Sequence, residues 1–154
     1  MKVVKSGVIF MFMGEYRHSI DDKGRLIIPS RVREDLGNQF IVTRGLEGCL
    51  FIYPKSEWDN IIQKYKQLPD TKDRRYFMRI FLSGATVSEL DKQGRVNIPA
   101  PLVEYASLEK ECIIIGVDER LEVWSKDRWD GFIDENESNL SEIADNLFAS
   151  SLNN

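Results

Sequence analysis

Four apolar runs along the chain have the length and composition of buried strands. They are rich in β-branched and aromatic residues, and short turns that contain Gly or charged residues join them in pairs. Their sequences are QFIVT (39–43), CLFIYP (49–54), ECIIIG (111–116) and RLEVW (120–124). The pattern predicts one pair of strands in each half of the chain.

Three longer segments have the apolar spacing of helices. Residues 56–69 and 71–84 carry apolar residues at helical intervals, and Pro69 separates them. Residues 139–152 place an apolar stripe on one helical face, formed by Leu140, Ile143, Ala144 and Leu147. We therefore predict two helices in the middle of the chain and a helical segment near its end.

One short phrase occurs twice. IDDKGRLIIP (20–29) and LDKQGRVNIP (90–99) share an Asp, a Gly-Arg pair and a final Ile-Pro at the same positions. The match continues downstream, where Trp58 and Trp129 coincide and each is followed by Asp. Because about 45 residues recur in register, the chain contains a duplicated module.

The repeated phrase predicts a tight turn followed by a short strand. Asp at the first turn position and Gly at the fourth favour a type I turn, and Gly can take the positive φ that closes such a hairpin with a bulge. Arg25 and Arg95 then begin the strands, and Pro29 and Pro99 are expected as first helical residues. The residues that strand alternation buries are Leu26, Ile28, Val96 and Ile98.

A module of this size is too small to bury a self-sufficient core. Two copies can bury their apolar faces against each other, so we predict an α+β, β-rich fold: two tandem modules that form a pseudo-two-fold β-barrel with flanking helices. The expected divisions are residues 1–14 (N-terminal extension and start of the first strand), 15–57 (first module), 58–84 (linking helices), 85–129 (second module) and 130–154 (acidic helical tail).

Charge is unevenly distributed along the chain. The formal net charge of −4 argues weakly against a nucleic-acid partner. Residues 1–81 nevertheless contain 15 Lys or Arg against 10 Asp or Glu, whereas residues 82–154 contain 6 against 15. Such a division suggests that one face meets a polyanion while another is solvated or faces a partner, although ordinary surface scatter would also produce it.

Few residues are suited to catalysis or metal binding. Cys49 and Cys112 are the two cysteines, and their apolar surroundings predict buried thiols and not a disulfide or a metal site. His18, the single histidine, is expected on the surface of a strand. Without a nucleophile motif, a phosphate loop or metal-ligand spacing, we expect no enzyme, metal or cofactor. No apolar run reaches the roughly 20 residues that cross a bilayer, so a cytoplasmic protein is expected.

The region around the first phrase resembles a known family. MFMGEYRHSIDDKGRLIIPSRVRE (11–34) closely resembles the start of the MraZ family of bacterial transcriptional regulators, and DKQGR stands at that family's second Asp-x-x-x-Arg motif. The resemblance covers about residues 11–150. It implies AbrB-like modules with swapped hairpins, and binding to double-stranded DNA at direct repeats upstream of the regulator's own division and cell wall gene cluster, usually as a repressor. It also implies a ring-shaped homo-oligomer, located with the nucleoid.

The resemblance carries specific DNA-binding residues over to this chain. They are Lys23, Gly24 and Arg25 in the first motif, and Lys92, Gly94 and Arg95 in the second. Gln93 replaces the basic residue found at Lys23, so the second motif is expected to hold phosphate less well. Arg31 and Arg33 give the first module a basic helix start, which we expect to contact the DNA backbone.

The chemistry of the motif suits DNA recognition. An Arg directly after a turn projects on a rigid base, where its planar fork can contact guanine O6 and N7, worth about 1–3 kcal/mol of discrimination. Asp21 and Asp91 are expected to cap the turn or fix the guanidinium group, because a carboxylate that faced phosphate would be repelled. A turn signature with a solvated Arg would explain one copy, but two copies in register favour the DNA interpretation.

Other interpretations remain open on sequence grounds. An antitoxin-like or other protein-interaction module could use the acidic second half to bind a basic partner, and it would not shift promoter DNA. A basic cluster at Arg74, Arg75 and Arg79 is either a further DNA contact or the solvated side of a helix. The residues expected to contact a neighbouring subunit are Val103, Tyr105 and Leu108.

Overall fold

The computed structural model describes the chain except at residues 1–3, 6–7, 10 and 153–154. Parts of the predicted N-terminal extension and the end of the predicted acidic tail therefore lie outside the described residues. Within the extension, β1 (Val4–Lys5) and β2 (Val8–Ile9) pair as a short antiparallel ribbon.

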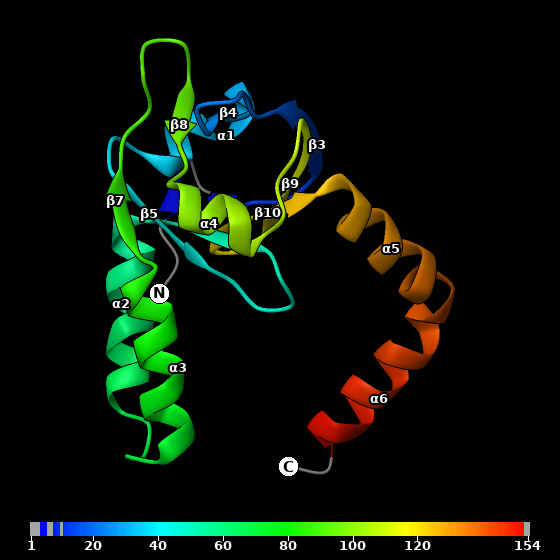
Figure 1. Cartoon of the computed structure of the whole chain (residues 1–154). Helices are drawn as coiled ribbons and strands as arrows, with labels where there is room; N and C mark the ends of the chain where they lie inside the picture. The colour runs from blue at the N-terminus through cyan, green and yellow to red at the C-terminus, as the bar shows by residue number, and fades with distance from the viewer. Residues whose placement is uncertain (1–3, 6–7, 10, 153–154) are drawn as a thin grey trace.

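The two halves of the chain contribute the same succession of elements (Figure 1). The first half contains β3 (Glu15–Ser19), β4 (Arg25–Ile27), α1 (Ser30–Leu36), β5 (Phe40–Arg44), β6 (Leu50–Pro54), α2 (Lys55–Lys66) and α3 (Lys72–Ser83). The second contains β7 (Thr86–Ser88), β8 (Arg95–Asn97), α4 (Ala100–Tyr105), β9 (Glu111–Val117), β10 (Arg120–Ser125), α5 (Lys126–Asn136), the 3-10 helix η1 (Glu137–Asn139) and α6 (Leu140–Leu152). The duplication predicted from the sequence is therefore present in the order of strands and α-helices, and η1 is an addition in the second half.

Strands from both halves are interleaved in one antiparallel sheet of six strands. Their order is β3-β9-β10-β6-β5-β7, so the first strand of each half pairs with a strand of the other half. The halves meet at the centre, where Leu121 of β10 lies opposite Ile52 of β6. The order is the same when it is read from either edge with the halves exchanged, which gives the sheet pseudo-two-fold symmetry.

A separate ribbon of two strands lies over one face of the sheet (Figure 1). It is formed by β4 and β8, with Leu26 opposite Val96 at its centre. The fold is thus α+β and rich in antiparallel strands, as predicted. Among the described strands the sheet and the ribbon are separate hydrogen-bonded units, so the closed barrel stays a prediction.

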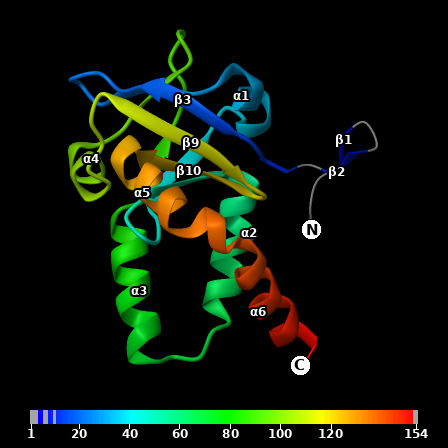
Figure 2. The ribbon, with the colours of Figure 1, turned by 90° about the vertical axis from the view of Figure 1, so that its right-hand side faces the viewer.

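The four central strands of the sheet, β9, β10, β6 and β5, are buried on both faces, which explains why they read as nearly unbroken apolar runs. Toward the ribbon, alternate strand residues such as Val42 and Ile114 pack with the predicted apolar residues of β4, β8 and the segments after them. On the other face, Phe51, Tyr53 and Trp124 form a core that α2, α3 and α5 cover (Figures 1 and 2). The four predicted core residues are confirmed at 0–1% exposure: Leu26, Ile28, Val96 and Ile98.

The two cysteines and the single histidine all lie on or beside strands of the six-stranded sheet. Cys49 and Cys112 are buried free thiols as predicted, and burial raises the pKa of each to about 12. His18 lies on β3, but it is partly buried, and its pKa is lowered by desolvation and then by nearby Arg33. The described residues contain no cluster that could hold a metal ion, and no helix among them is long and apolar enough to span a membrane.

The prediction for the two prolines is wrong, and the predicted subunit contact is wrong for Leu108. Pro29 and Pro99 precede their helices and are not the first helical residues, because their ψ angles of 134° and 146° are extended. Of the residues predicted to contact a neighbouring subunit, Leu108 is 7% exposed, and the Tyr105 hydroxyl donates to the carbonyl oxygen of Gly45 at 2.6 Å. Both side chains are therefore used within the chain.

Candidate nucleic-acid interface

Each repeated phrase folds into a tight turn with a glycine bulge, as predicted. The N–H of Gly24 donates to the carbonyl oxygen of Asp21 at 3.0 Å, and the N–H of Asp21 donates to the carbonyl oxygen of Arg25 at 3.1 Å. The corresponding distances in the second copy are 3.0 and 2.8 Å. Gly24 and Gly94 have φ values of 81° and 76°, which favour glycine over residues with a side chain.

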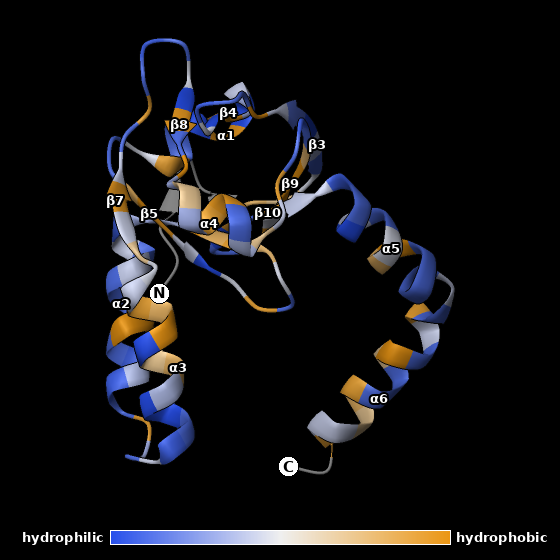
Figure 3. Cartoon of the chain, viewed as in Figure 1, coloured by the Kyte–Doolittle hydropathy of each residue, from blue (hydrophilic) through white to orange (hydrophobic). Residues whose placement is uncertain are grey.

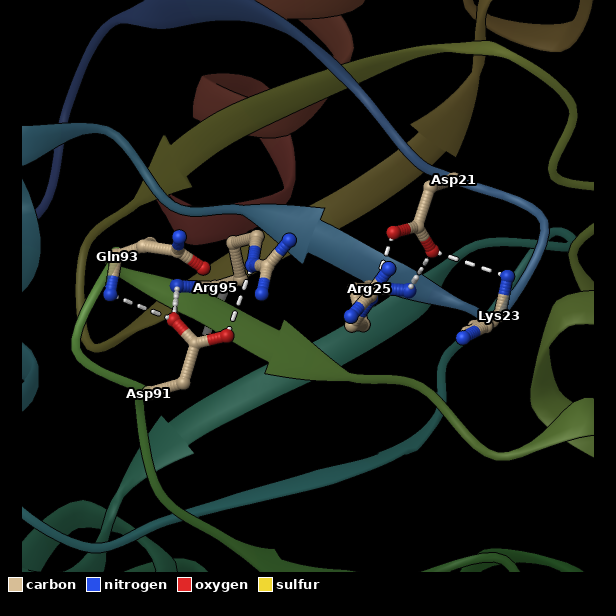
Figure 4. Close-up of polar contacts among 6 residues, drawn as sticks. All are labelled: Asp21, Lys23, Arg25, Asp91, Gln93 and Arg95. Atoms are coloured by element: carbon tan, nitrogen blue, oxygen red, sulfur yellow. Dashed lines mark hydrogen bonds and ion pairs between the residues drawn. The ribbon is translucent and has the colours of Figure 1, made fainter.

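The carboxylate of each motif holds both the turn and the arginine (Figure 4). Oδ1 of Asp21 accepts from the N–H groups of Lys23 and Arg25 at 3.0 and 2.9 Å, and its Oδ2 accepts from Nε of Arg25 at 2.6 Å. Asp91 makes the same three contacts at 2.9, 2.9 and 2.8 Å. The positioning role predicted for the two aspartates agrees with this geometry.

These contacts keep both carboxylates ionised. The pKa of Asp21 lies below its ordinary value, mainly because the backbone N–H of Arg25 donates to the carboxylate and also because the Arg25 side chain does so. The pKa of Asp91 is lowered in the same way by Arg95. The two arginines are therefore each fixed by a charge-assisted hydrogen bond at neutral pH.

The arginines remain available on their outer side. The guanidinium groups contact aspartate through Nε, and the side chains of Arg25 and Arg95 are 37% and 25% exposed. The ribbon register places Arg25 opposite Asn97, and Arg95 opposite Ile27. The two arginines are therefore diagonal neighbours on one face of the ribbon. Diagonal residues on paired antiparallel strands have their Cα atoms about 7–8 Å apart.

The ribbon has one buried and one outward face. Leu26 and Val96 point into the core, whereas the outward positions alternate with them and are occupied by Arg25, Ile27, Arg95 and Asn97. Lys23 and Lys92 are exposed on the turns at either end. A ribbon of two strands fits the DNA major groove, and exposed lysines at its ends can contact phosphate.

Arg33 supports the second turn from the first module. Its Nε donates to the carbonyl oxygen of Ile28 at 2.8 Å, and its guanidinium group lies so close to Gly94 that a Cβ there would overlap Cζ. At the first turn, Val103 stands in the place of Arg33, and an open groove of about 830 Å³ lies between that turn and α4. The second turn is therefore packed against the Arg33 side chain, whereas the first turn borders an open groove.

The remaining predicted residues occupy different environments. Arg31 is exposed on α1, next to the ribbon in sequence. Gly24 and Gly94 are buried, and their N–H groups are used inside the turns. Sequence reasoning missed the contact between Arg33 and Gly94; the one signal for it was that Arg33 and Val103 differ at matched positions.

Comparison with known proteins agrees with the duplicated architecture. The family model of MraZ protein, whose description also raises an antitoxin-like assignment, matches residues 11–80 and again residues 81–150. The chain is 55% identical over 138 residues to the transcriptional regulator MraZ of Ligilactobacillus salivarius (strain UCC118). This match covers 89% of the chain and 96% of that relative. The chain therefore belongs to the MraZ family.

Proposed function

We propose that this protein is a transcriptional regulator that binds double-stranded DNA with the outward face of the β4–β8 ribbon and its two turns. The observation that carries the proposal is the matched pair of Asp–Arg contacts, which present Arg25 and Arg95 on one face. Each guanidinium group is held through Nε, so its outer edge is preorganised for guanine or phosphate. Lys23, Lys92 and Arg31 are the proposed phosphate contacts.

The two turns have unequal roles in this proposal. The first offers Lys23 beside its arginine and the basic start of α1, whereas the second has Gln93 at the matching place. Arg33, which the basic helix start predicted as a contact to the DNA backbone, acts on DNA through the second turn that it supports. We therefore expect the first motif to contribute more affinity than the second.

Binding to direct repeats and self-assembly follow from the small size of the ribbon. One ribbon offers too little contact for tight binding against genomic competition, whereas linked copies gain avidity. We propose that the protein assembles into a ring and represses its own division and cell wall gene cluster in the nucleoid. Repeats spaced by about one helical turn, roughly 10 base pairs, would meet successive ribbons on one side of the DNA.

A footprint of the protein on DNA upstream of its own gene tests this function. We expect protection of short repeated boxes at a spacing of about one helical turn, roughly 10 base pairs. Scrambling one box should weaken binding to the others, because the copies act together. Protection that is equal on unrelated DNA would contradict a sequence-specific regulator.

The alternative is a protein-interaction module, and the acidic segment from α5 to α6 favours it. Residues 129–154 contain no Lys or Arg, so this segment could bind a basic partner. Such a module would not shift promoter DNA, and substitution of Arg25 or Arg95 would not affect its partner.

A further inference from the structure

Helix α6 exposes an apolar stripe along its length. The large apolar residues of α6 are 46–86% exposed, and the helix shows orange bands as it extends away from the sheet (Figure 3). They are Leu140, Ile143, Leu147, Phe148 and Leu152. An amphipathic helix gains most of its stability when its apolar face is covered, so this stripe calls for a partner.

The duplication shows that α6 differs from its counterpart in the first module. α3 follows α2 as α6 follows α5, but α3 folds back on α2, where Phe77 and Phe81 pack against Tyr65 at 5.3 and 5.8 Å between ring centroids. α6 instead continues from α5 through η1 and leaves the body of the protein (Figures 1 and 2). Within the described part of the chain, α6 therefore does not form a helical hairpin like the one in which α3 packs on α2.

The outer side of α3 exposes apolar residues with a basic rim. Tyr76 and Ile80 are 50% and 55% exposed, and both point away from the side of the helix that buries Phe81. Lys72 Nζ lies 5.2 Å from the centroid of the Tyr76 ring, and Arg79 Cζ lies 5.8 Å from it. An acidic amphipathic helix would match both the apolar centre and the cationic rim.

Charge selects which helices can pair between copies. Residues 129–152, in α5, η1 and α6, contain no Lys or Arg; their acidic residues are Asp130, Asp134, Glu135, Glu137, Glu142 and Asp145. Pairing α6 with α6 would set acid against acid, and pairing α3 with α3 would set base against base. Pairing α6 with α3 joins opposite charges around two apolar stripes, and the helices have similar lengths of 13 and 12 residues.

We propose that α6 of one copy packs on the outer face of α3 of the next copy. The two contacting surfaces differ, so the interface is head-to-tail, and such contacts close into a ring when the rotation between copies permits. This inference rests on the self-assembly part of the proposed function. It does not depend on DNA binding, because the ribbon takes no part in the contact.

A mixing experiment with two variants tests the pairing directly. Leu147→Asp puts a charge into the α6 stripe, and Ile80→Asp puts one into the α3 face; both sites are more than half exposed, so the fold should tolerate them. In sedimentation measurements without DNA, the wild type should assemble and each variant alone should fall to the 17.8 kDa of one chain. An equimolar mixture should form a dimer, because each variant keeps one intact surface.

A control variant and the possible masses distinguish the pairing of α6 with α3 between copies from other arrangements of α6. Leu46→Asp, at an exposed apolar residue in the β5–β6 turn, is the matched control and should assemble as the wild type does. Retained assembly in either test variant, or a mixture that stays monomeric, would overturn the pairing of α6 with α3. If α6 folded back on its own chain, neither variant would lower the mass. A monomeric wild type would also overturn the proposed self-assembly, whereas DNA binding would be judged separately.

Discussion

The guanidinium group of Arg33, on α1 of the first module, lies against Gly94 in the turn of the second module. The same side chain donates from Nε to the carbonyl oxygen of Ile28 at 2.8 Å, while Ile28 N–H donates to the carbonyl oxygen of Gly94 at 2.9 Å. These contacts join the first helix, the ribbon and the second turn. Because Val103 replaces Arg33 in the other module, this support exists on one side of the ribbon.

Gly94→Ala should destabilise the protein for two reasons that can be separated. A φ of 76° disfavours alanine, at a cost of about 1–2 kcal/mol, and the new Cβ overlaps the Arg33 guanidinium group. In an Arg33→Ala background the first cost remains and the overlap disappears. The free energy of unfolding should be measured in urea for the wild type, Gly94→Ala, Arg33→Ala and the double variant. Gly94→Ala should lower this free energy less when residue 33 is alanine. An equal effect in both backgrounds would show that Arg33 does not press on the turn.

Salt dependence should distinguish a phosphate contact from a residue that acts through the turn. Lys23→Ala should weaken DNA binding and reduce the slope of log affinity against log salt concentration by about one. Arg33→Ala should weaken binding while it leaves that slope close to the wild-type value, because Arg33 contacts Gly94 and not phosphate. Affinities measured between about 50 and 200 mM salt give both slopes. A reduced slope in Arg33→Ala would return this residue to the DNA contacts.

Asp21→Asn should weaken DNA binding without unfolding the protein. The amide oxygen can still accept from the turn N–H groups, but the amide nitrogen cannot accept from Nε of Arg25, so the guanidinium group loses its fixed position. Asp91→Asn should have the same effect on Arg95. Circular dichroism should match the wild type, while a shift assay should show lower affinity. Wild-type affinity in both variants would remove the positioning role of the aspartates.

The two aspartates should titrate at unusually low pH. Each carboxyl has a pKa below its ordinary 3.8, chiefly through a backbone N–H donor. A lowered folded-state pKa means that the stabilising contribution is complete above the ordinary value and is lost as the pH falls through the folded value. Carboxyl-carbon NMR titrations should give midpoints below 3.8 for both residues, and Arg25→Ala should raise the Asp21 midpoint only in part because its backbone donor remains. Midpoints at or above 3.8 would contradict the geometry.

The sequence predicted the local features of the site well, because their causes are local. Asp at the first turn position and Gly at the fourth determine the turn, and strand alternation determines that Leu26 and Val96 are buried. The duplication followed from matched positions such as Trp58 and Trp129.

Long-range relationships could not be predicted in the same way. Pairing Leu26 with Val96 depends on register between distant strands, which no local pattern specifies. The sequence predicted Leu108 at a subunit contact, but the residue is buried in the core that both modules form. Local pattern does not reveal such burial. The direction of α6 depends on η1, whose sequence does not reveal whether the helices on either side fold back or continue.

The most direct test of the central claim is a shift assay on DNA from upstream of the gene, with wild type, Arg25→Ala and Arg95→Ala. Arg25→Ala should abolish specific binding, and Arg95→Ala should weaken it less, because Gln93 stands where the first motif has Lys23. Both side chains are on the outward face of the ribbon, so circular dichroism should show an intact fold. Wild-type affinity in both folded variants would contradict DNA recognition by the ribbon.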